Sequence, residues 1–186
     1  MKIVKPDKLG IQEAVEILRR GGTVVYPTDT AYALGGMFDS KKVTKNILAI
    51  KNRTDEKFTL ICSSLNQVKK FFKLDNFSLK LAKKYWPGPL SIVVSDKFAV
   101  RVPANKLARI LAQRAGKPLV ATSANLSGNN NLYNSAKVIE EFEGRQYQPD
   151  LIIDAGILPK IKPSTLVKVE GLKVKVIRIG LIKPKI

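Results

Sequence analysis

The sequence contains no histidine, one cysteine and no long apolar run, and each shortage excludes a class of protein. Without histidine there is no Ser-His-Asp or Cys-His catalytic unit, no two-histidine zinc site and no imidazole general base. A single cysteine excludes an internal disulfide framework and a cysteine-cluster metal site. No stretch reaches the ~18 apolar residues of a membrane span, and the start, MKIVKPDKLG, lacks a signal-peptide core. We therefore expect a cytoplasmic protein whose chemistry relies on Lys, Arg, hydroxyls, amides and carboxylates.

Acidic residues are also scarce, because 15 Asp and Glu face 33 Lys and Arg and give a formal net charge of +18. A strongly basic chain suggests an anionic partner such as nucleic acid. The cations do not form one block, since they occur as pairs at 41–42, 69–70 and 83–84 and alternate through 168–185. A solvated lysine surface explains that distribution equally well, so charge alone leaves RNA binding open.

The length of 186 residues and the apolar fraction of 45% fit one globular domain with a real core, which we expect to span residues 1–186. Apolar periodicity predicts that helices and strands alternate. The expected helices cover 10–20, a segment capped by Ser40, 64–72, 77–86, 105–115 and 135–142. The expected strands cover 23–26, 59–62, 90–94, 99–102, 119–122, 151–154, 164–169 and 174–179. This order predicts an α/β (α+β) fold built on one mixed sheet.

Two polar segments in the first half of the chain could carry chemistry. Residues 26–36, YPTDTAYALGG, end a strand with hydroxyls and a carboxylate before a glycine pair. Such a turn can offer donors to a small polar ligand, although an ordinary capped turn has the same composition. Lys51, Asn52 and Arg53, with Lys57 nearby, follow an apolar helix. They could clamp a polyphosphate, or they could simply complement the helix C-terminus.

Two further groups lie in the second half. Residues 121–128, ATSANLSG, form a small, hydroxyl-rich turn that suits phosphate or adenine, or merely caps a loop; the turn lacks the glycine-lysine ending of a Walker loop. The cations inside two apolar strands are arginines, Arg101 and Arg178, although the chain otherwise prefers lysine. A buried charge needs a partner, which could be Asp29, Asp154, or a ligand carboxylate or phosphate.

Together and in this order, the segments resemble the YrdC-type threonylcarbamoyl-adenylate synthase family. The matching stretches, spread over residues 21–180, are GGTVVYPTDTAYALG, AIKNR, WPGPLSIVV, VRVPAN, GKPLVATSANLSG, IIDAG, PSTLVKV and VIRIG. The resemblance implies a twisted mixed sheet flanked by helices around a concave basic cavity. It also implies a nucleotidyltransferase that makes L-threonylcarbamoyladenylate and pyrophosphate from L-threonine, bicarbonate or CO₂, and ATP. Mg²⁺ would accompany ATP, with no metal site in the protein itself. A partner protein complex would then pass the threonylcarbamoyl group to tRNA.

The resemblance assigns roles to individual residues by their positions in the matching motifs. The residues implied for L-threonine are Thr30, Arg101, Ala121 and Ser164. The residues implied for ATP are Lys51, Arg53, Lys57, Ser123, Asn125, Asn131 and Arg178, with Lys51 and Arg53 as the catalytic pair. The implied chemistry needs alignment and charge neutralisation more than a side-chain base, which agrees with the absence of histidine.

Three positions depart from the family pattern: Ala33, Phe58 and Ala155 stand where glycine or proline is frequent. They keep two alternatives open on the same fold. One is a non-catalytic protein that binds tRNA or double-stranded RNA. The other is a paralogue that acts on a different carbamoyl or nucleotide substrate. Longer members of the family continue into a linker and a second domain, which we do not expect in residues 1–186.

Overall fold

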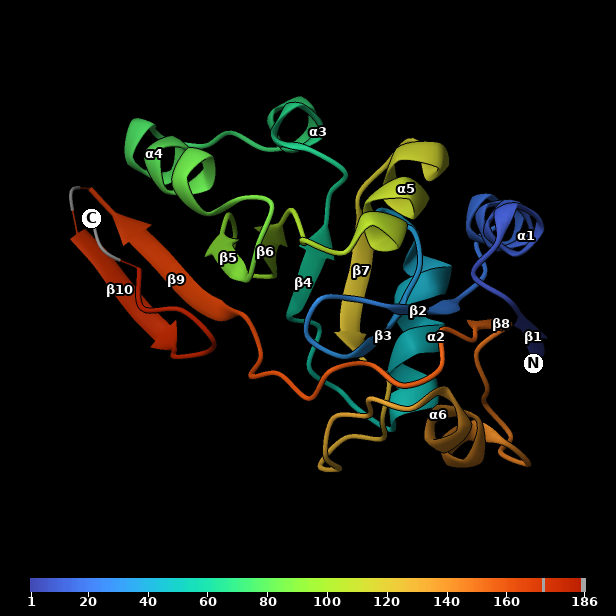
Figure 1. The fold of residues 1–186 in the computed structure, drawn as a ribbon. Helices are drawn as coiled ribbons and strands as arrows, with labels where there is room; N and C mark the ends of the chain where they lie inside the picture. Colours follow the sequence, from blue (N-terminus) through green and yellow to red (C-terminus); the bar gives the residue numbers. More distant parts are fainter. Residues whose placement is uncertain (172, 185–186) are drawn as a thin grey trace.

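The computed structural model describes residues 1–171 and 173–184, which build one ten-stranded mixed sheet with helices on both faces (Figure 1). The strand order is β1-β8-β2-β3-β7-β4-β6-β5-β9-β10. The strands are β1 (Lys2–Val4), β2 (Val24–Pro27), β3 (Tyr32–Gly35), β4 (Phe58–Ile61), β5 (Leu90–Val93), β6 (Phe98–Arg101), β7 (Leu119–Ser123), β8 (Leu151–Ile153), β9 (Thr165–Glu170) and β10 (Lys173–Arg178). The helices are α1 (Lys8–Arg19), α2 (Lys41–Lys51), α3 (Leu65–Phe71), α4 (Asn76–Tyr85), α5 (Lys106–Ala115) and α6 (Ser135–Phe142). The predicted α/β class and mixed sheet are confirmed.

Each of these helices begins after a polar residue whose side chain accepts a backbone N–H two or three residues further on. The capping residues are Asp7, Ser40, Ser64, Asp75, Asn105 and Asn134. Such caps satisfy donors that a helix start leaves without partners, so they fix where each helix begins. The predicted cap at Ser40 is confirmed, with its Oγ 3.3 Å from the N of Val43.

Two strands differ from the sequence prediction. β1 is short and its side chains are mostly exposed, so it left no pattern in the sequence, yet it pairs in parallel with β8. β3 replaces the expected turn, and it lies in the middle of the sheet between β2 and β7. Gly35 suggested a turn, but it lies within a strand where a side chain does not fit. A Cβ at this position would lie 1.7 Å from the carbonyl oxygen of Val120. Gly35 therefore permits close strand packing.

The two faces of the sheet are covered unequally. Helices α1 and α5 pack together on one face, against side chains that include Ile61 of β4. Helices α2 and α6 cover the other face, and α4 packs on β5 and β9. The register places Arg101 beside Ile61, and Thr59 shares that face because side chains alternate along a strand. Arg101 and Thr59 thus lie on the face of α1 and α5, beyond the area that these helices cover. None of the helices in the described residues is long and apolar enough to cross a membrane.

Candidate functional site

A cavity of about 570 Å³ opens on that uncovered part of the sheet. Its walls come from the turn between β2 and β3, from β4, β6 and β7, and from the β9–β10 hairpin. Its volume falls in the range of typical cofactor and substrate sites, roughly 300–1,000 Å³. The cavity can therefore hold a nucleotide or a ligand of similar size.

The charged lining of the cavity is almost entirely positive. Six cations and one carboxylate contribute to the walls. The cations are Arg53, Lys57, Lys97, Arg101, Lys168 and Arg178, and the carboxylate is Asp96. An enclosed site lined by one sign of charge concentrates ligands of the opposite sign. The site suits an anion that carries several charges.

Most of the residues singled out from the sequence meet in this cavity. Those that line it are Thr30, Arg53, Lys57, Arg101, Ala121, Ser123, Asn131, Ser164 and Arg178. Lys51 and Asn125 do not line it, since both side chains are buried behind the wall. The ligands assigned to all these residues stay predictions.

Arg101 is the most enclosed of the cavity cations, at 4% exposure. One terminal nitrogen lies 3.2 Å from Oδ1 of Asp29, within ion-pair distance but not aligned for a hydrogen bond. Nε and the other terminal nitrogen of Arg101 are buried without a hydrogen-bond partner among the described residues. Burial lowers the pKa of Arg101 and the Asp29 carboxylate raises it, and a guanidinium keeps its charge in either case. Arg101 thus presents two unused donors to a ligand.

Of the two carboxylates considered as partners for the strand arginines, Asp29 is the one that pairs with Arg101. Asp154 instead accepts the N–H of Gly156 at 2.9 Å. Hydrogen bonds hold the pKa of Asp154 below its usual value, the one from Ser135 most strongly. Asp154 therefore fixes a local turn.

The turn between β2 and β3 is held by one hydroxyl. Thr28 Oγ1 donates to the carbonyl oxygen of Ala31 at 2.7 Å and accepts the backbone N–H of Thr30 at 3.1 Å. It also lies 3.1 Å from Oγ1 of Thr30, which orients that hydroxyl in the cavity wall. Asp29 Oδ2 accepts the N–H of Ala104 at 3.1 Å and ties the turn to the segment before α5. The segment is both a capped turn and a rigid wall of the cavity.

Lys51 occupies an unusual position for a charged residue, with only 3% of its surface exposed. Its Nζ donates to the carbonyl oxygens of Ser123 at 2.7 Å and Asn125 at 2.6 Å, and lies 3.3 Å from Oδ1 of Asn125. Burial, with a smaller contribution from Arg53, lowers the pKa of Lys51 from 10.5 to about 8. The ammonium group therefore holds the turn after β7 from behind and does not face the cavity.

Arg53 and Arg178 are positioned by their neighbours. Arg53 donates to the carbonyl oxygen of Lys57 at 2.7 Å, and its guanidinium lies 5.3 Å from the ring centre of Phe58. Phe58, which departs from the family pattern, therefore supports Arg53. Arg178 donates to the carbonyl oxygen of Ser164 at 3.0 Å, and burial lowers its pKa. Both arginines are held at the wall before any ligand arrives.

Several lining residues were missed in the sequence analysis. They are Thr59, Ser95, Asp96, Lys97 and Lys168. Thr28 and Thr122 also line the cavity, and they belong to the polar segments 26–36 and 121–128 that the sequence singled out, although the resemblance assigned them no ligand. Lys97 and Lys168 pair with nearby glutamates, at 2.7 and 2.9 Å, and so look like ordinary surface lysines. Only the pairing of distant strands brings them to the cavity.

Comparisons with known proteins match the chain along most of its length. The family Sua5_yciO_yrdC, described as "Telomere recombination", matches residues 16–180. "Uncharacterized protein YciO" of Escherichia coli K12 is 32% identical over 197 residues, which cover 96% of this chain and 94% of that protein. An "Uncharacterized protein" of Haemophilus influenzae is 35% identical over 173 residues, which cover 84% of this chain and 82% of that protein.

Several solved structures are similar to this fold, and two of them are described here. The crystal structure of E. coli YciO superposes with a TM-score of 0.84 at 30% identity, and the match covers 97% of this chain and 95% of that one. The crystal structure of P. abyssi Sua5 complexed with L-threonine superposes with a TM-score of 0.85 at 29% identity. That match covers 96% of this chain but only 57% of the Sua5 chain, so this chain spans little more than half of it.

Proposed function

Because the chain belongs to the Sua5/YciO/YrdC family, we propose that it is an L-threonylcarbamoyladenylate synthase, a nucleotidyltransferase that serves the threonylcarbamoyladenosine modification of tRNA. Its substrates are L-threonine, bicarbonate or CO₂, and ATP, and its products are threonylcarbamoyl-AMP and pyrophosphate. In the cytoplasm, a partner complex takes the threonylcarbamoyl group onward to tRNA. The similar fold of a Sua5 structure that contains L-threonine supports the amino-acid part of the proposal.

The observation that carries this proposal is the Arg101 guanidinium. It is a buried charge with two unused N–H donors, in the wall of the same cavity as the Thr30 hydroxyl. An unsatisfied buried charge is costly, so such a group is retained where a ligand completes it. A guanidinium N–H forms a strong, charge-assisted hydrogen bond with a carboxylate. We expect the α-carboxylate of threonine to accept from the unpaired donors of Arg101, with Thr30 and Ser164 in the wall of the same cavity.

The remaining cations of the cavity bind the triphosphate of ATP. Arg53, Lys57 and Arg178 belong to the same cavity as Arg101, and the carbonyl contacts of Arg53 and Arg178 fix both guanidinium groups. Positioned cations of this kind stabilise charge that develops during phosphoryl transfer. Lys51 lies behind the cavity wall and supports it, because its Nζ donates to the carbonyl oxygen of Ser123 and holds the turn after β7.

The chemistry balances without a side-chain base. The threonine amine attacks CO₂ and loses a proton to water, which leaves a carbamate. A carbamate oxygen then attacks the α-phosphorus of ATP, and the bond to the departing pyrophosphate breaks. The protein contributes alignment and neutralisation of charge, which together can supply most of the acceleration of such a reaction.

Mg²⁺ is part of the proposal as a companion of ATP. No group of three or more Cys, Asp or Glu side chains in the described residues is arranged to hold a metal ion, and Asp96 is the single carboxylate of the cavity lining. A cavity lining with one carboxylate is compatible with Mg²⁺ that enters bound to the ATP phosphates, since Mg²⁺ usually binds phosphates and few protein groups. When bound, the ion would neutralise phosphate charge.

Release of pyrophosphate from ATP, measured with and without threonine in bicarbonate buffer, tests the proposal. We expect pyrophosphate release that depends on threonine. In Arg101→Gln, adding threonine should no longer produce this release. The control is Arg114→Gln, because Arg114 is an exposed arginine of α5. If the parent protein releases pyrophosphate equally with and without threonine, or releases none, the proposal is contradicted.

A second candidate is the paralogue with another carbamoyl or nucleotide substrate. The observation that favours it is that Ala33 and Phe58, two of the departures from the family pattern, line the cavity. The same assay separates the two, because other amino acids or other nucleotides would then replace threonine or ATP as the compound required for release.

A further inference from the structure

Glu141, on α6, is a carboxylate that the proposed reaction does not use. Its Oε1 accepts the backbone N–H of Leu126 at 2.8 Å and a side-chain N–H of Asn129 at 2.8 Å. Both donors belong to residues 124–134, which connect β7 to α6 and which we call the β7–α6 segment. The donors lie 15 and 12 residues earlier in the chain, so no local pattern in the sequence marks Glu141.

The β7–α6 segment depends on side chains for its shape. The structure describes all of residues 124–134 and places no helix or strand among them. Backbone groups outside regular structure need other partners, and side chains often supply them. Lys51 holds the start of the segment through the carbonyl oxygens of Ser123 and Asn125. Glu141 holds its middle from α6. Two residues of opposite charge therefore support one irregular segment.

These two supports are connected through asparagine side chains. Oδ1 of Asn125 lies 3.3 Å from the Nζ of Lys51, and Nδ2 of Asn125 donates to the carbonyl oxygen of Asn129. The side chain of Asn129 in turn donates to Glu141. A continuous chain of hydrogen bonds thus runs from Lys51 to Glu141, and removal of the Glu141 carboxylate breaks it at one end.

The carboxylate of Glu141 is kept in its ionised form. Burial raises its pKa, but the hydrogen bonds from Leu126 and Asn129 and the charges of Arg145 and Lys51 outweigh burial and hold the pKa below its usual value. An ionised carboxylate can only accept hydrogen bonds, and those bonds are stronger than bonds between neutral groups. Glu141 is therefore a firm attachment point for the segment.

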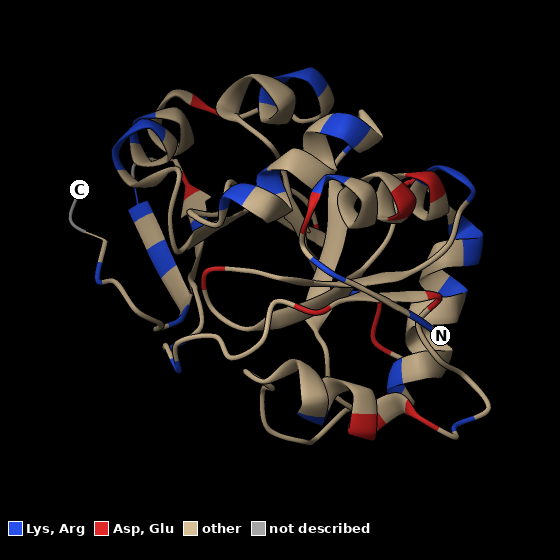
Figure 2. Cartoon of the chain, turned by 45° about the vertical axis from the view of Figure 1, so that its right-hand side comes forward, with Lys and Arg blue, Asp and Glu red and all other residues tan. Residues whose placement is uncertain are grey.

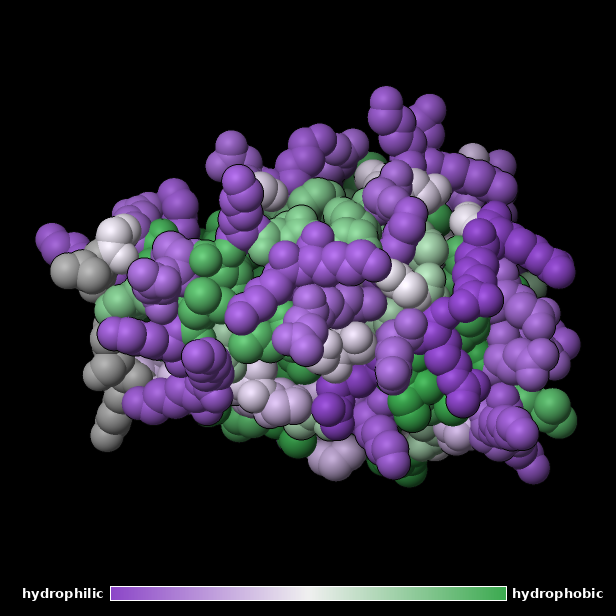
Figure 3. Space-filling view, turned by 90° about the horizontal axis from the view of Figure 1, so that it is seen from above, coloured by the Kyte–Doolittle hydropathy of each residue, from purple (hydrophilic) through white to green (hydrophobic). Residues whose placement is uncertain are grey.

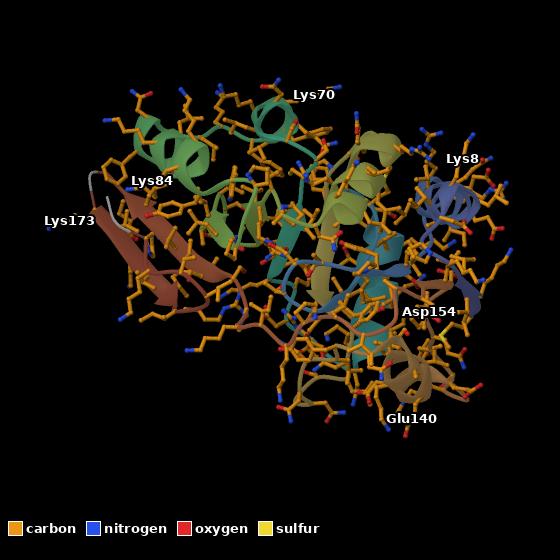
Figure 4. The ribbon with its side chains drawn as sticks, in the orientation of Figure 1. Lys8, Lys70, Lys84, Glu140, Asp154 and Lys173 are labelled. Atoms are coloured by element: carbon orange, nitrogen blue, oxygen red, sulfur yellow. The ribbon has the colours of Figure 1, made fainter. Side chains whose placement is uncertain are left out.

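Glu141 differs from its neighbour Glu140 in its surroundings. Figure 3 shows hydrophilic side chains outermost on the face over α3 to α5, and Figure 2 shows acidic residues in red on α6, the lowest helix of that view. Glu140, labelled in Figure 4, is exposed and pairs with Lys137 at 2.7 Å. Glu141 is half-buried, has no ion-pair partner among the described residues, and accepts both of its hydrogen bonds from one segment. Two adjacent glutamates thus have different functions, and Glu140 provides a matched control.

We propose that Glu141 is a positioning residue for ATP, because it fixes the segment that leads to Asn131 in the cavity wall. The inference rests on the proposed function, which assigns Asn125 and Asn131 to ATP. Thr30 and Arg101, assigned to threonine, belong to other elements, the β2–β3 turn and β6. Loss of the Glu141 carboxylate therefore weakens the binding of ATP and leaves the binding of threonine unchanged.

The test compares Glu141→Ala and Glu141→Gln with the control Glu140→Ala. Calorimetric titration of each protein with ATP, and separately with threonine, measures binding without turnover. Pyrophosphate release gives kcat and the KM for each substrate. We expect Glu141→Ala to bind ATP at least about tenfold more weakly than the parent, with a matching rise in the KM for ATP. Threonine binding should stay within about twofold of the parent, because its site lies on other elements.

The conservative variant shows whether the hydrogen bonds cause the effect. Glu141→Gln keeps an oxygen acceptor, so it should recover part of the lost ATP affinity, and it decides the matter if Glu141→Ala does not fold. Glu140→Ala should bind both compounds as the parent does, since an exposed ion pair contributes little.

The inference is wrong if Glu141→Ala binds ATP as tightly as Glu140→Ala does. It is also wrong if ATP and threonine binding weaken together, which is the result of a purely structural role, or if Glu141→Gln recovers nothing, which would assign the effect to charge alone. If the parent binds ATP but releases no pyrophosphate, the synthase proposal fails and the ATP titrations still test Glu141. A parent that binds no ATP would refute both.

Discussion

Replacing Lys51 with methionine distinguishes two possible roles of this residue, a phosphate ligand and a support for the turn after β7. The sequence alone does not distinguish them. If Lys51 clamps phosphate, the change removes a ligand contact and leaves the empty protein as stable as before. If Lys51 holds the turn after β7, as its contacts with Ser123 and Asn125 indicate, the change destabilises the protein when no ligand is present. Stability without ligand therefore distinguishes the two roles.

The expected size of the effect follows from the contacts. The Lys51→Met variant leaves three oxygens of Ser123 and Asn125 without their donor, at about 2 kcal/mol each for a buried acceptor. The same change removes a buried charge. The fall of the Lys51 pKa from 10.5 to about 8 corresponds to roughly 3 kcal/mol of relief. A net loss of about 3 kcal/mol remains, which is a large part of the stability of an ordinary domain, about 5–15 kcal/mol.

Urea unfolding without ligand measures this loss directly, and a thermal scan should show a drop in Tm of roughly 6–12 °C. Lys45→Met is the matched control, because Lys45 is an exposed lysine of the same helix. The reasoning is wrong if Lys51→Met unfolds at the same urea concentration as Lys45→Met. If that variant also binds ATP poorly, Lys51 is a phosphate ligand after all.

Three further predictions come from the same structure. The gap in stability between the parent and Lys51→Met should widen by up to about 3 kcal/mol from pH 8 to 10.5, because the unfolded chain there binds the proton that native Lys51 has lost; urea unfolding at several pH values measures it. Asp29→Asn leaves Arg101 uncompensated at a cost of about 3 kcal/mol, so threonine should raise the Tm of that variant more than it raises the Tm of the parent; equal shifts would count against a carboxylate site. Gly35→Ala would push a Cβ into the carbonyl oxygen of Val120, and we expect little soluble protein, which expression trials would show.

The helix starts and most strands could be predicted from the sequence because their causes are local. Ser40 and Asn105 precede apolar periodicity and cap the helices that follow. β3 could not be predicted, since Gly35 and Gly36 are typical of turns. Gly35 is required by the approach of Val120, a residue far away in the sequence, and Gly36 by the approach of Val43 in the next helix. A glycine needed for close packing looks the same in sequence as a glycine needed for a bend.

The position of the cavity was predictable only in part, for a similar reason. Arg101 and Arg178 stood out because charged residues within apolar strands need partners, and both line the cavity. Nothing local distinguishes Lys97 or Lys168 from surface lysines, because their place in the wall depends on strand order. Their pairing with Glu56 and Glu170 also reduces the charge that they offer a ligand.

The contrast between Lys51 and Arg53 explains why spacing alone could not assign their roles. Lys51 is the last residue of α2, and its side chain points back under the turn after β7. Asn52 then adopts a left-handed conformation, with φ of 50°, which reverses the chain direction at the helix end. Arg53 leaves that reversal on the cavity side, while its own N–H still donates to the carbonyl oxygen of Leu48 at 3.0 Å. Lys51 and Arg53, separated by a single residue, thus lie in different places: Lys51 behind the cavity wall and Arg53 in it. The reason is that Asn52 adopts a positive φ, which asparagine does more readily than most residues.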